Sequence, residues 1–376
     1  MKNWLKVWGI AILLSLLAGN GHAADWDFYG SVKLQVFNYE SSEERENHLA
    51  SLGETDPYTN FQFKLDKYTT KLGAWVTHDD LTAVVEIRPD NDGVGDDVMR
   101  LWYGSWDFGG GELLIGQSWT PLNMFYSSAA AEDENNMLDY GALWELRHPM
   151  IQLTYKGLKL ALVEPGDETS SFYSRASWIM EAGKIETKMP KIEAKYTHEI
   201  GPAKIDVYGG YNSYDFTLNS NDKTVSIDSY VAGAGLTLTF GDFKMSGASY
   251  FAQNAGPMGL LQTVNYSDPE LDANNDVLDN ESFGWLAVAS YIVNDKIRLE
   301  AGYSELTTEL DDDAVWSTKD ETAAYYFQVR YTVFDKFFIV PEVGFIDYKT
   351  AYWAWDGRNG DAGDKSYVGA KLQYDF

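Results

Sequence analysis

The chain has 376 residues and a net charge of −28 at pH 7, from 57 acidic and 29 basic side chains. Such an acidic excess repels polyanions, so nucleic acid is excluded as a partner. The absence of cysteine excludes a disulfide framework and a thiolate metal site, and we expect no cofactor. Aromatic residues make up 15% of the chain, yet its mean hydropathy is −0.33. This pairing is typical of transmembrane β-barrels, which show lipid only alternate residues and carry aromatic girdles at both interfaces.

The N-terminal segment has the pattern of a secretory signal peptide. Lys2 and Lys6 precede an apolar run over residues 7–18, and small side chains follow at Gly21 and Ala23. The run is shorter than the roughly 20 apolar residues of a membrane helix, which argues against the alternative of an uncleaved anchor. We therefore expect export, with cleavage after Ala23.

The remainder of the chain is dominated by apolar and polar residues in alternation, the pattern of strands with one apolar face. Clear runs occur over residues 28–36, 81–88, 230–240 and 366–376. Their length matches the ~9–11 residues with which a tilted strand crosses a membrane. The composition does not shift along the chain, so we expect one barrel domain over residues 24–376 after a signal peptide over 1–23.

Very short and long connections alternate between these runs. The short ones carry the Gly, Asn, Asp or Pro residues of tight hairpins and lie at Asp79-Asp80, Gly109-Gly110-Gly111, Lys156-Gly157, Gly201-Pro202, Gly241-Asp242, Asn294-Asp295 and Asp335-Lys336. The long ones run approximately from Glu40 to Asn60, Pro89 to Asp97, Ser118 to Trp144, Glu164 to Lys188, Asn212 to Ser226, Gln253 to Glu281, Glu305 to Glu321 and Thr350 to Lys365. Seven turns and eight loops connect sixteen strands, an even number that leaves both termini on the periplasmic side, with the short turns.

These observations predict an all-β fold, a 16-stranded antiparallel transmembrane β-barrel. A soluble β-sandwich is the alternative, but it gives no reason for the alternation of turn lengths. The last strand, Ser366–Phe376, places Tyr374 and Phe376 on one apolar face, and we expect it to pair with the first strand at Asp27–Tyr39. A barrel of this kind is expected in the outer membrane of a Gram-negative-type bacterium.

Several segments resemble the general-diffusion porins of the Gram-negative outer membrane. They are Asp27–Leu34, Arg100–Gly104, Leu114–Gly116, Arg147–Leu160 and Tyr374–Phe376. The resemblance implies a homotrimer of sixteen-stranded barrels in which the third long loop, Ser118–Trp144, folds inward and forms the constriction. It also implies a water-filled pore for small hydrophilic solutes, and a terminal Phe376 that is read by the barrel-assembly machinery.

The sequence departs from the family pattern in the region of the constriction. Gln117 follows Gly116 where an Arg is common, and Ala129–Glu134 stands in place of the frequent Pro-Glu-Phe-Gly-Gly-Asp motif. The composition of the constriction therefore has to come from this sequence itself.

Charged residues are the candidates for the constriction, because a pore selects by radius and by the field in a narrow gap. The acidic candidates in the third long loop are Glu132, Asp133, Glu134 and Asp139. No basic residue lies between Ser118 and Trp144. The alternative is a solvated external loop whose charges only maintain solubility.

The basic candidates are placed on the lumen face by strand parity and are Lys33, Lys71, Arg88 and Arg100. Neighbours such as Val32 and Leu72 occupy the apolar face, where a cation would cost a few kcal/mol. Arg147 is a further candidate, although alternation puts it on the apolar face with Ile151, and only a bulge at Pro149 would turn it inward. For each base the alternative is a lumen charge away from the constriction. Opposed acids and bases leave a mainly transverse field, so the excess of carboxylates predicts weak cation selectivity.

Two other classes of function stay open. A substrate-specific channel for sugars or organic acids would stack solutes on aromatic residues, and the candidates are Trp75, Trp102, Trp106, Trp119 and Trp144. An outer-membrane hydrolase would need a nucleophile with a histidine base. The histidines of the mature chain are His48, His78, His148 and His198. No G-x-S-x-G motif accompanies them, so we expect no enzyme.

The expected partners are outer-membrane lipid, lipopolysaccharide, further copies of the chain and small hydrophilic solutes. Divalent cations could link the acidic sixth and seventh long loops to lipopolysaccharide, but a solvated acidic surface is the simpler interpretation. Asp272–Asp276 begins like a calcium loop, yet Val277 stands where glycine is required. We therefore predict no metal site.

Overall fold

The computed structural model describes residues 25–376 with gaps at 52, 54, 56–59, 90–97, 166–170, 175–178, 261–266, 312–317 and 354–357. The predicted leader and its cleavage position lie outside the described residues. No helix in the described part of the chain is long and apolar enough to cross a membrane.

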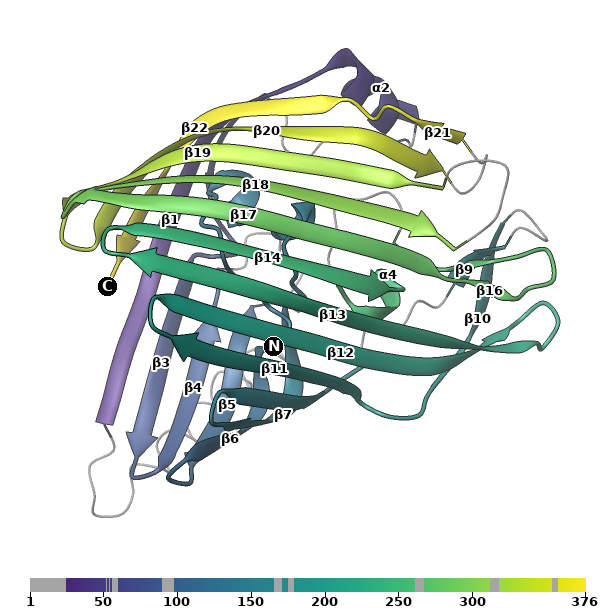
Figure 1. The fold of residues 1–376 in the computed structure, drawn as a ribbon, viewed down its shortest axis with the longest axis horizontal. Coiled ribbons are helices and arrows are strands. Elements are labelled where there is room, and N and C mark those ends of the chain that lie inside the picture. Colours follow the sequence, from purple (N-terminus) through teal and green to yellow (C-terminus); the bar gives the residue numbers. More distant parts are fainter. Residues whose placement is uncertain are drawn as a thin grey trace, which may run out of the picture.

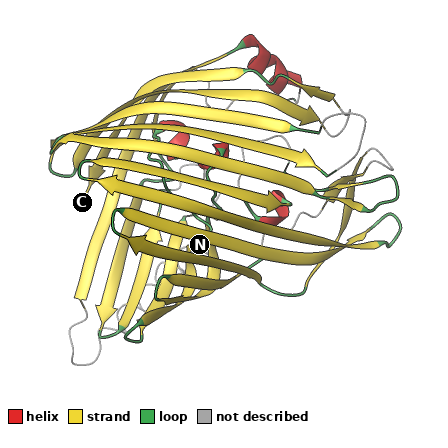
Figure 2. Cartoon of the chain, in the orientation of Figure 1, coloured by secondary structure: helices red, strands yellow, loops and turns green. Residues whose placement is uncertain are grey.

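Sixteen antiparallel strands form a closed barrel, as the alternation of turns and loops predicts (Figure 1, Figure 2). Two of the sixteen are interrupted, and the wall consists of β1 (Asp25–Ser41), β2 (Asn60–Leu65) with β3 (Lys71–His78), β4 (Leu81–Ile87), β5 (Met99–Asp107), β6 (Gly111–Trp119), β7 (Arg147–Tyr155), β8 (Leu158–Val163), β10 (Ile179–Thr187) with β11 (Lys191–Ile200), β12 (Ala203–Leu218), β13 (Thr224–Phe240), β14 (Phe243–Gln253), β17 (Asn280–Asn294), β18 (Ile297–Leu310), β19 (Asp320–Phe334), β20 (Phe337–Trp353) and β22 (Asp364–Asp375). The loops hold short elements, namely α2 (Glu43–Ser51), α3 (Ala131–Glu134), η1 (Leu138–Tyr140), β9 (Ser171–Ser174), α4 (Ala255–Met258), β15 (Glu270–Leu271), β16 (Val277–Leu278) and β21 (Arg358–Gly360).

The first and last strands close the barrel. β1 pairs with β22 from Ser31 opposite Asp375 to Ser41 opposite Lys365. The Gly30 N–H also donates to the carbonyl of the terminal Phe376 at 3.0 Å. The predicted pairing of the chain ends is therefore confirmed, and neither strand is left as an open edge within the membrane.

The second wall strand is interrupted by a turn that the sequence did not reveal. β1 pairs with β3 at its start and with β2 at its end, and the turn between them is fixed by Asp66. The Asp66 carboxylate accepts the backbone N–H groups of Tyr68 and Thr69 at 3.1 and 3.0 Å. This Asx-type arrangement satisfies backbone donors without a ladder partner, so the strand can break inside the barrel wall.

All seven predicted short turns connect neighbouring wall strands, but several predicted long loops are too long. β12 runs to Leu218 and β13 begins at Thr224, inside the segment Asn212–Ser226 that was expected to be a loop. The prediction was wrong because the strands continue beyond the lipid-facing part, where a small external core holds them together. This core contains Phe172, Tyr214, Phe216, Leu218, Ile227 and Leu271.

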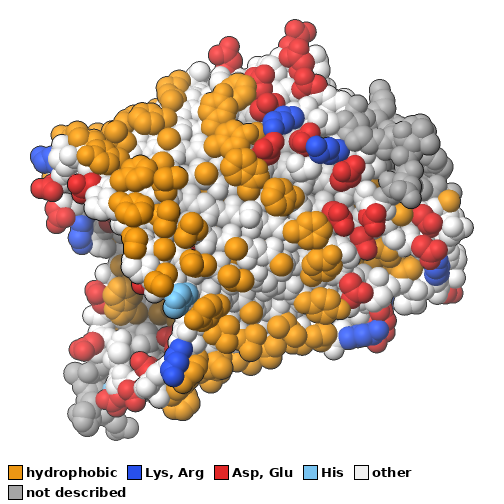
Figure 3. Space-filling model, viewed as in Figure 1, with side chains coloured by type: hydrophobic (Ala, Val, Ile, Leu, Met, Phe, Trp, Pro, Cys, Tyr) orange, Lys and Arg blue, Asp and Glu red, His pale blue; other side chains and the backbone are white. Residues whose placement is uncertain are grey.

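The face of the barrel seen in Figure 3 carries many hydrophobic side chains across its middle, with charged side chains toward its ends. Phe28, Leu236 and Phe240 on predicted apolar faces are 66%, 43% and 57% exposed. Trp102 and Trp106 belong to the same outer surface, because each lies opposite an outward residue of β4. The outward alternation expected for a transmembrane barrel is therefore present in the structure.

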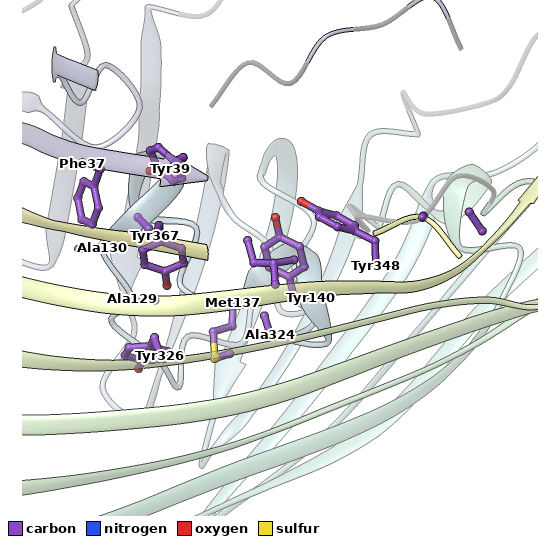
Figure 4. Packing of buried hydrophobic residues seen from close by; sticks show 14 residues of the cluster. Phe37, Tyr39, Ala129, Ala130, Met137, Tyr140, Ala324, Tyr326, Tyr348 and Tyr367 are labelled. Carbon is purple, nitrogen blue, oxygen red and sulfur yellow. The ribbon is translucent and has the colours of Figure 1, made fainter. Parts of the chain in front are cut away.

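The third long loop lies inside the barrel, where it carries α3 and η1. Its residues Ala129, Ala130 and Ala131 are buried against tyrosines of the wall (Figure 4). The cluster joins Phe37 and Tyr39 of β1 with Tyr326, Tyr348 and Tyr367 of β19, β20 and β22. Small side chains on the loop let its backbone approach these rings closely, and this contact explains the alanine run in place of the family motif.

Candidate functional site

The loop 3 tip, defined here as Ala129–Glu134, is bound to the barrel wall by ion pairs. The Lys365 Nζ atom lies 2.5 Å from Glu132 Oε1, and the Lys64 Nζ atom lies 2.9 Å from Asp133 Oδ2. Both carboxylate residues are 8% exposed. The acids therefore contact lysines of β2 and β22 and do not simply project into an open gap.

Glu134 has two lysine partners. Lys33 donates to its Oε2 at 2.5 Å, and Lys371 pairs with its Oε1. Burial alone would raise the pKa of Glu134, but the ammonium groups of Lys371 and Lys33 lower it to about 2. Glu134 lies in the loop and not in a membrane-spanning strand, and it stays ionised at any physiological pH.

Two wall carboxylates hold the backbone at the start of the tip. Glu342 accepts the N–H groups of Ala130 and Ala131 at 2.6 and 3.0 Å, and Glu300 accepts the N–H of Ser128 at 2.9 Å. Charge-assisted hydrogen bonds of this kind are stronger than neutral ones. The loop is thus fixed from both sides, by its own acids and by acids of the wall.

The tip also contains backbone strain. Glu132, Asp133 and Glu134 all have positive φ angles, 50°, 63° and 59°. Non-glycine residues rarely occupy this region, and each costs of order 1–3 kcal/mol unless the surroundings enforce it. The ion pairs of the three side chains are the contacts that compensate this cost.

A cavity of about 380 Å³ separates the loop 3 tip from the wall formed by β4 to β7. Charged residues from both sides line it, namely Glu132, Asp133, Glu134, Arg88, Arg100 and Arg147. The structure therefore brings together three of the four predicted acids and three of the five predicted bases. The side chain of Asp139 lies outside the described part of the structure.

Two of the cavity arginines are oriented by neighbouring groups. Arg100 Nε donates to Glu86 at 2.6 Å, and its guanidinium also contacts the Tyr68 carbonyl. The Arg88 guanidinium lies over the Tyr68 ring, 4.9 Å from its centre. Both side chains lie in the lumen, where the sequence placed them, but Arg100 does so at the register shift between β4 and β5, where strict alternation is interrupted.

Arg147 reaches the cavity by a route that differs from the prediction. The register between β6 and β7 is continuous up to Trp119 opposite Arg147, so Arg147 does not reach the lumen through a bulge at Pro149, the route that the sequence left open. Arg147 is the first residue of β7, and its guanidinium stacks on the Trp119 ring at 3.7 Å. At a strand end the alternation is not enforced by a following pair, and the stacking decides the direction of the side chain.

The two remaining predicted bases do not line this cavity. Lys33 is engaged by Glu134, and Lys71 lies 2.9 Å from Glu86 Oε2, lower on the same wall. Lys64, Lys365 and Lys371 were missed by the sequence reasoning, although they partner the predicted acids. The same parity rule would have identified them, because neighbours such as Val368 and Phe63 face outward.

The Trp candidates separate into two groups. Trp119 and Trp144 line the cavity, and Trp75 stacks on the lumen residue Tyr29 with ring centres 5.1 Å apart. Trp102 and Trp106 face outward, as described above. Trp102 is two residues after the lumen residue Arg100, but the register shift between β4 and β5 near Arg100 turns Trp102 outward.

A second loop enters the barrel beside the stem of loop 3. Its helix α4 packs Ala255 and Met258 against Leu122, Met124 and Leu143 of loop 3, and all five are buried. We call these five residues the lumen plug. A dry apolar cluster of this kind leaves no room for water, so it fills the lumen beside β12 to β14.

Buried charges border the lumen plug. Glu145, Lys191 and Glu193 are at most 1% exposed, and Lys191 pairs with Glu145. Burial and the adjacent Glu193 raise the pKa of Glu145, which lies in the loop before β7, well above its ordinary value. His148 Nε2 lies 3.5 Å from Glu145 Oε1.

The barrel, its lumen and its inward loop show which fold this chain has. A closed 16-stranded barrel with an apolar outer surface, a charged lumen and an inward third loop has the fold of the outer-membrane porins. No protein-family model matches the chain, and no curated protein matches it either.

Solved structures of outer-membrane proteins share this fold. The outer-membrane channel DcaP of Acinetobacter baumannii is 17% identical, with a TM-score of 0.67 over 94% of this chain and 98% of that one. The trimer form of OmpT, an outer-membrane protein of Vibrio cholerae, is 15% identical, with a TM-score of 0.57 over 94% and 100%. An anion-selective porin from Comamonas acidovorans is 12% identical, with a TM-score of 0.58 over 94% and 100%.

Proposed function

We propose that this protein is an outer-membrane porin that forms a water-filled channel for the passive diffusion of small hydrophilic solutes and ions. The observation that carries the proposal is the charged cavity of about 380 Å³ between the loop 3 tip and the β4–β7 wall. A loop fixed inside a barrel, with charges on both sides of the gap, provides the radius and the field by which pores select.

We propose Glu132, Asp133, Glu134 and Asp139 as the acidic side of the constriction and Arg88, Arg100 and Arg147 as its basic side. We assign Lys33 to the ion pairs that hold the loop 3 tip, because it pairs with Glu134. We assign Lys71 to the barrel wall outside the cavity, where it pairs with Glu86. The ion pairs with Lys64, Lys365 and Lys371 support a double role for the acids, because they position the loop as well as contribute to the field.

We further propose weak cation selectivity. The net charge of −28 supports it, since an acidic protein raises the local concentration of cations at the pore entrances. The cavity arginines oppose it, and the lysine partners weaken the contribution of the loop acids. The preference is therefore the small difference between two opposed sets of charges.

Planar-bilayer recording tests these proposals. Purified protein should form discrete channels whose conductance rises linearly with the KCl concentration. Changing Glu132, Asp133, Glu134 and Asp139 together to Gln or Asn should shift the zero-current potential in a salt gradient toward anion preference. Arg88→Gln with Arg100→Gln should shift it toward cation preference, and both shifts should shrink at 1 M salt, where screening acts within ~3 Å. No channel formation would contradict the porin proposal, and unchanged potentials would contradict the site.

We propose a homotrimer in the outer membrane, in contact with lipid and lipopolysaccharide, after removal of residues 1–23. A structural neighbour in trimer form supports the assembly. Unheated SDS gels and native mass determination should show the trimer, and N-terminal sequencing should begin at Ala24. Deletion of Phe376 should lower the amount of assembled barrel if the terminal aromatic is read by the assembly machinery.

The alternative of a substrate-specific channel is supported by Trp119 and Trp144 in the cavity. Saturation of the current by one solute would favour it over general diffusion. We propose no enzymatic activity, and hydrolysis of lipid or peptide by the purified protein would contradict this part.

A further inference from the structure

We propose that the cavity binds solutes that carry a carboxylate on a planar apolar ring. The inference rests on the proposed function, because the solute has to reach the cavity through the pore. It names a class of ligand that neither a small ion nor a sugar represents.

The first observation is the apolar part of the cavity lining. Six of its residues are apolar, and they are Met99, Trp119, Phe125, Leu138, Trp144 and Leu146. Phe125 is 48% exposed and Leu146 is 37% exposed, although both lie beside the charged groups of the cavity. Phe125 meets Trp119 edge to face, with ring centres 4.9 Å apart. A water-filled gap for ions gains nothing from such a surface, whereas a flat ring can cover it and release water.

The second observation is the position of the arginines relative to these rings. The Arg147 guanidinium carbon lies over the Trp119 ring, 3.7 Å from its centre, and the Arg88 guanidinium lies over Tyr68. Stacking uses the face of a guanidinium and directs its N–H edge sideways, the geometry in which arginine binds carboxylates. Trp119 therefore provides at one place an apolar surface and an oriented cation.

The third observation is the balance of charge around the cavity. The lining acids are paired with lysines that stand behind them on the wall, at Lys33, Lys64, Lys365 and Lys371. Glu342 and Glu300 hold the backbone of the tip from the wall, and Glu86 pairs with Arg100. Arg88 and Arg147, which lie over aromatic rings, are the lining cations on the side of the cavity opposite the tip acids, and they supply the positive charge that a carboxylate requires.

The fourth observation is size. A cavity of about 380 Å³ lies within the ~300–1,000 Å³ range of small-molecule sites. A single ring with one carboxylate fits it and leaves room for water. The same space beside the aromatic shelf gives acetate no apolar contact and offers benzylammonium the wrong charge.

The test is single-channel recording in KCl with benzoate, acetate and benzylammonium as probes on the wild-type protein. Benzoate should reduce the ion current with a saturable concentration dependence, and acetate and benzylammonium at equal concentrations should do so at least about tenfold more weakly. Arg147→Gln with Arg88→Gln should weaken the benzoate effect at least about tenfold. Phe125→Ala should reduce the block by benzoate to nearly the level of the block by acetate. It should leave the block by acetate unchanged.

The matched control is Arg330→Gln. Arg330 also stacks on an aromatic ring, with its guanidinium 3.9 Å from the centre of Phe338, but it is not a lining residue of this cavity. This variant removes one positive charge from the lumen, as each of the two cavity substitutions does by itself, and should keep the benzoate effect. Heat-modifiable mobility on SDS gels and channel formation in KCl alone show that each variant is folded.

Three results would overturn the inference, and they are distinct from failure of the porin proposal. They are a benzoate effect that does not saturate, equal block by benzylammonium, and equal loss of block in Arg330→Gln and in the double arginine variant. If no channels form in KCl without any probe, the porin proposal itself is wrong.

Discussion

Two loop regions fill the lumen of this barrel, and they are held in opposite ways. The loop 3 tip is fixed by ion pairs such as Glu134 with Lys33 and Lys371, and it borders the charged cavity. The lumen plug is fixed by apolar contacts between α4 and the loop 3 stem, around Met258 and Leu122. The difference shows that charged contacts hold the loop where it borders the cavity, whereas apolar contacts fill the lumen beside β12 to β14.

The largest effect is expected from Glu134→Gln. Removing this carboxylate leaves two lysines beside each other, and their side chains are only 13% and 8% exposed. Breaking a buried pair in this way costs roughly 3–5 kcal/mol. Denaturant unfolding in lipid vesicles should show the loss, and channel recordings should show a noisy current because the tip detaches. A quiet current with unchanged stability would show that Glu342 and Glu300 hold the loop alone.

Met258→Ala tests the other region. The Met258 side chain is fully buried, so its truncation leaves a cavity and should lower the free energy of unfolding by roughly 2–5 kcal/mol. Zero-current potentials should not change, because no charge moves near the constriction. A shift of selectivity without loss of stability would mean that α4 lines the conducting path.

The pH dependence should also separate the two regions. The pKa of Glu134 in the folded protein, about 2, lies below its ordinary value of 4.5, so its stabilisation is fully present above pH 4.5 and is lost as the pH falls toward 2. The pKa of Glu145 is raised above its ordinary value in the folded protein. Its stabilisation is therefore present at low pH and is lost as the pH rises through the raised pKa. Glu193, Lys191 and His148 are the charged or titratable groups that face it.

Recordings at different pH test this opposition. Current noise from detachment of the loop 3 tip should appear only as the pH falls toward the Glu134 pKa of about 2. Glu145→Gln should reduce any loss of stability at high pH. Noise that begins at pH 5 would contradict the assignment of Glu134 as the anchor.

The smallest effect is expected from Asp215→Asn. Asp215 pairs with Lys188 at the exposed end of β12, and surface pairs of this kind contribute little. Neither the unfolding midpoint nor the conductance should change measurably. It serves as the control for Glu134→Gln, since both variants remove one carboxylate that pairs with lysine, but Asp215 has one exposed lysine partner and Glu134 has two largely buried ones.

The sequence by itself determined the barrel. Alternation of apolar residues, seven short turns and the terminal aromatic are local patterns, and together they fix the number, the parity and the direction of the strands. Parity also placed Lys33, Lys71, Arg88 and Arg100 on the lumen side, because a cation facing lipid is too costly for a strand to tolerate.

Only the tertiary structure decided which charges meet. Lys365 and Lys371 are more than 200 positions away from the loop 3 tip, and no local pattern connects them with Glu132 and Glu134. The break at Asp66, the direction of Arg147 and the entry of α4 likewise depend on contacts with distant strands and loops. Curvature of the closed wall brings these groups together, and their pairing follows from burial, which makes an unpartnered charge more costly than a strained loop.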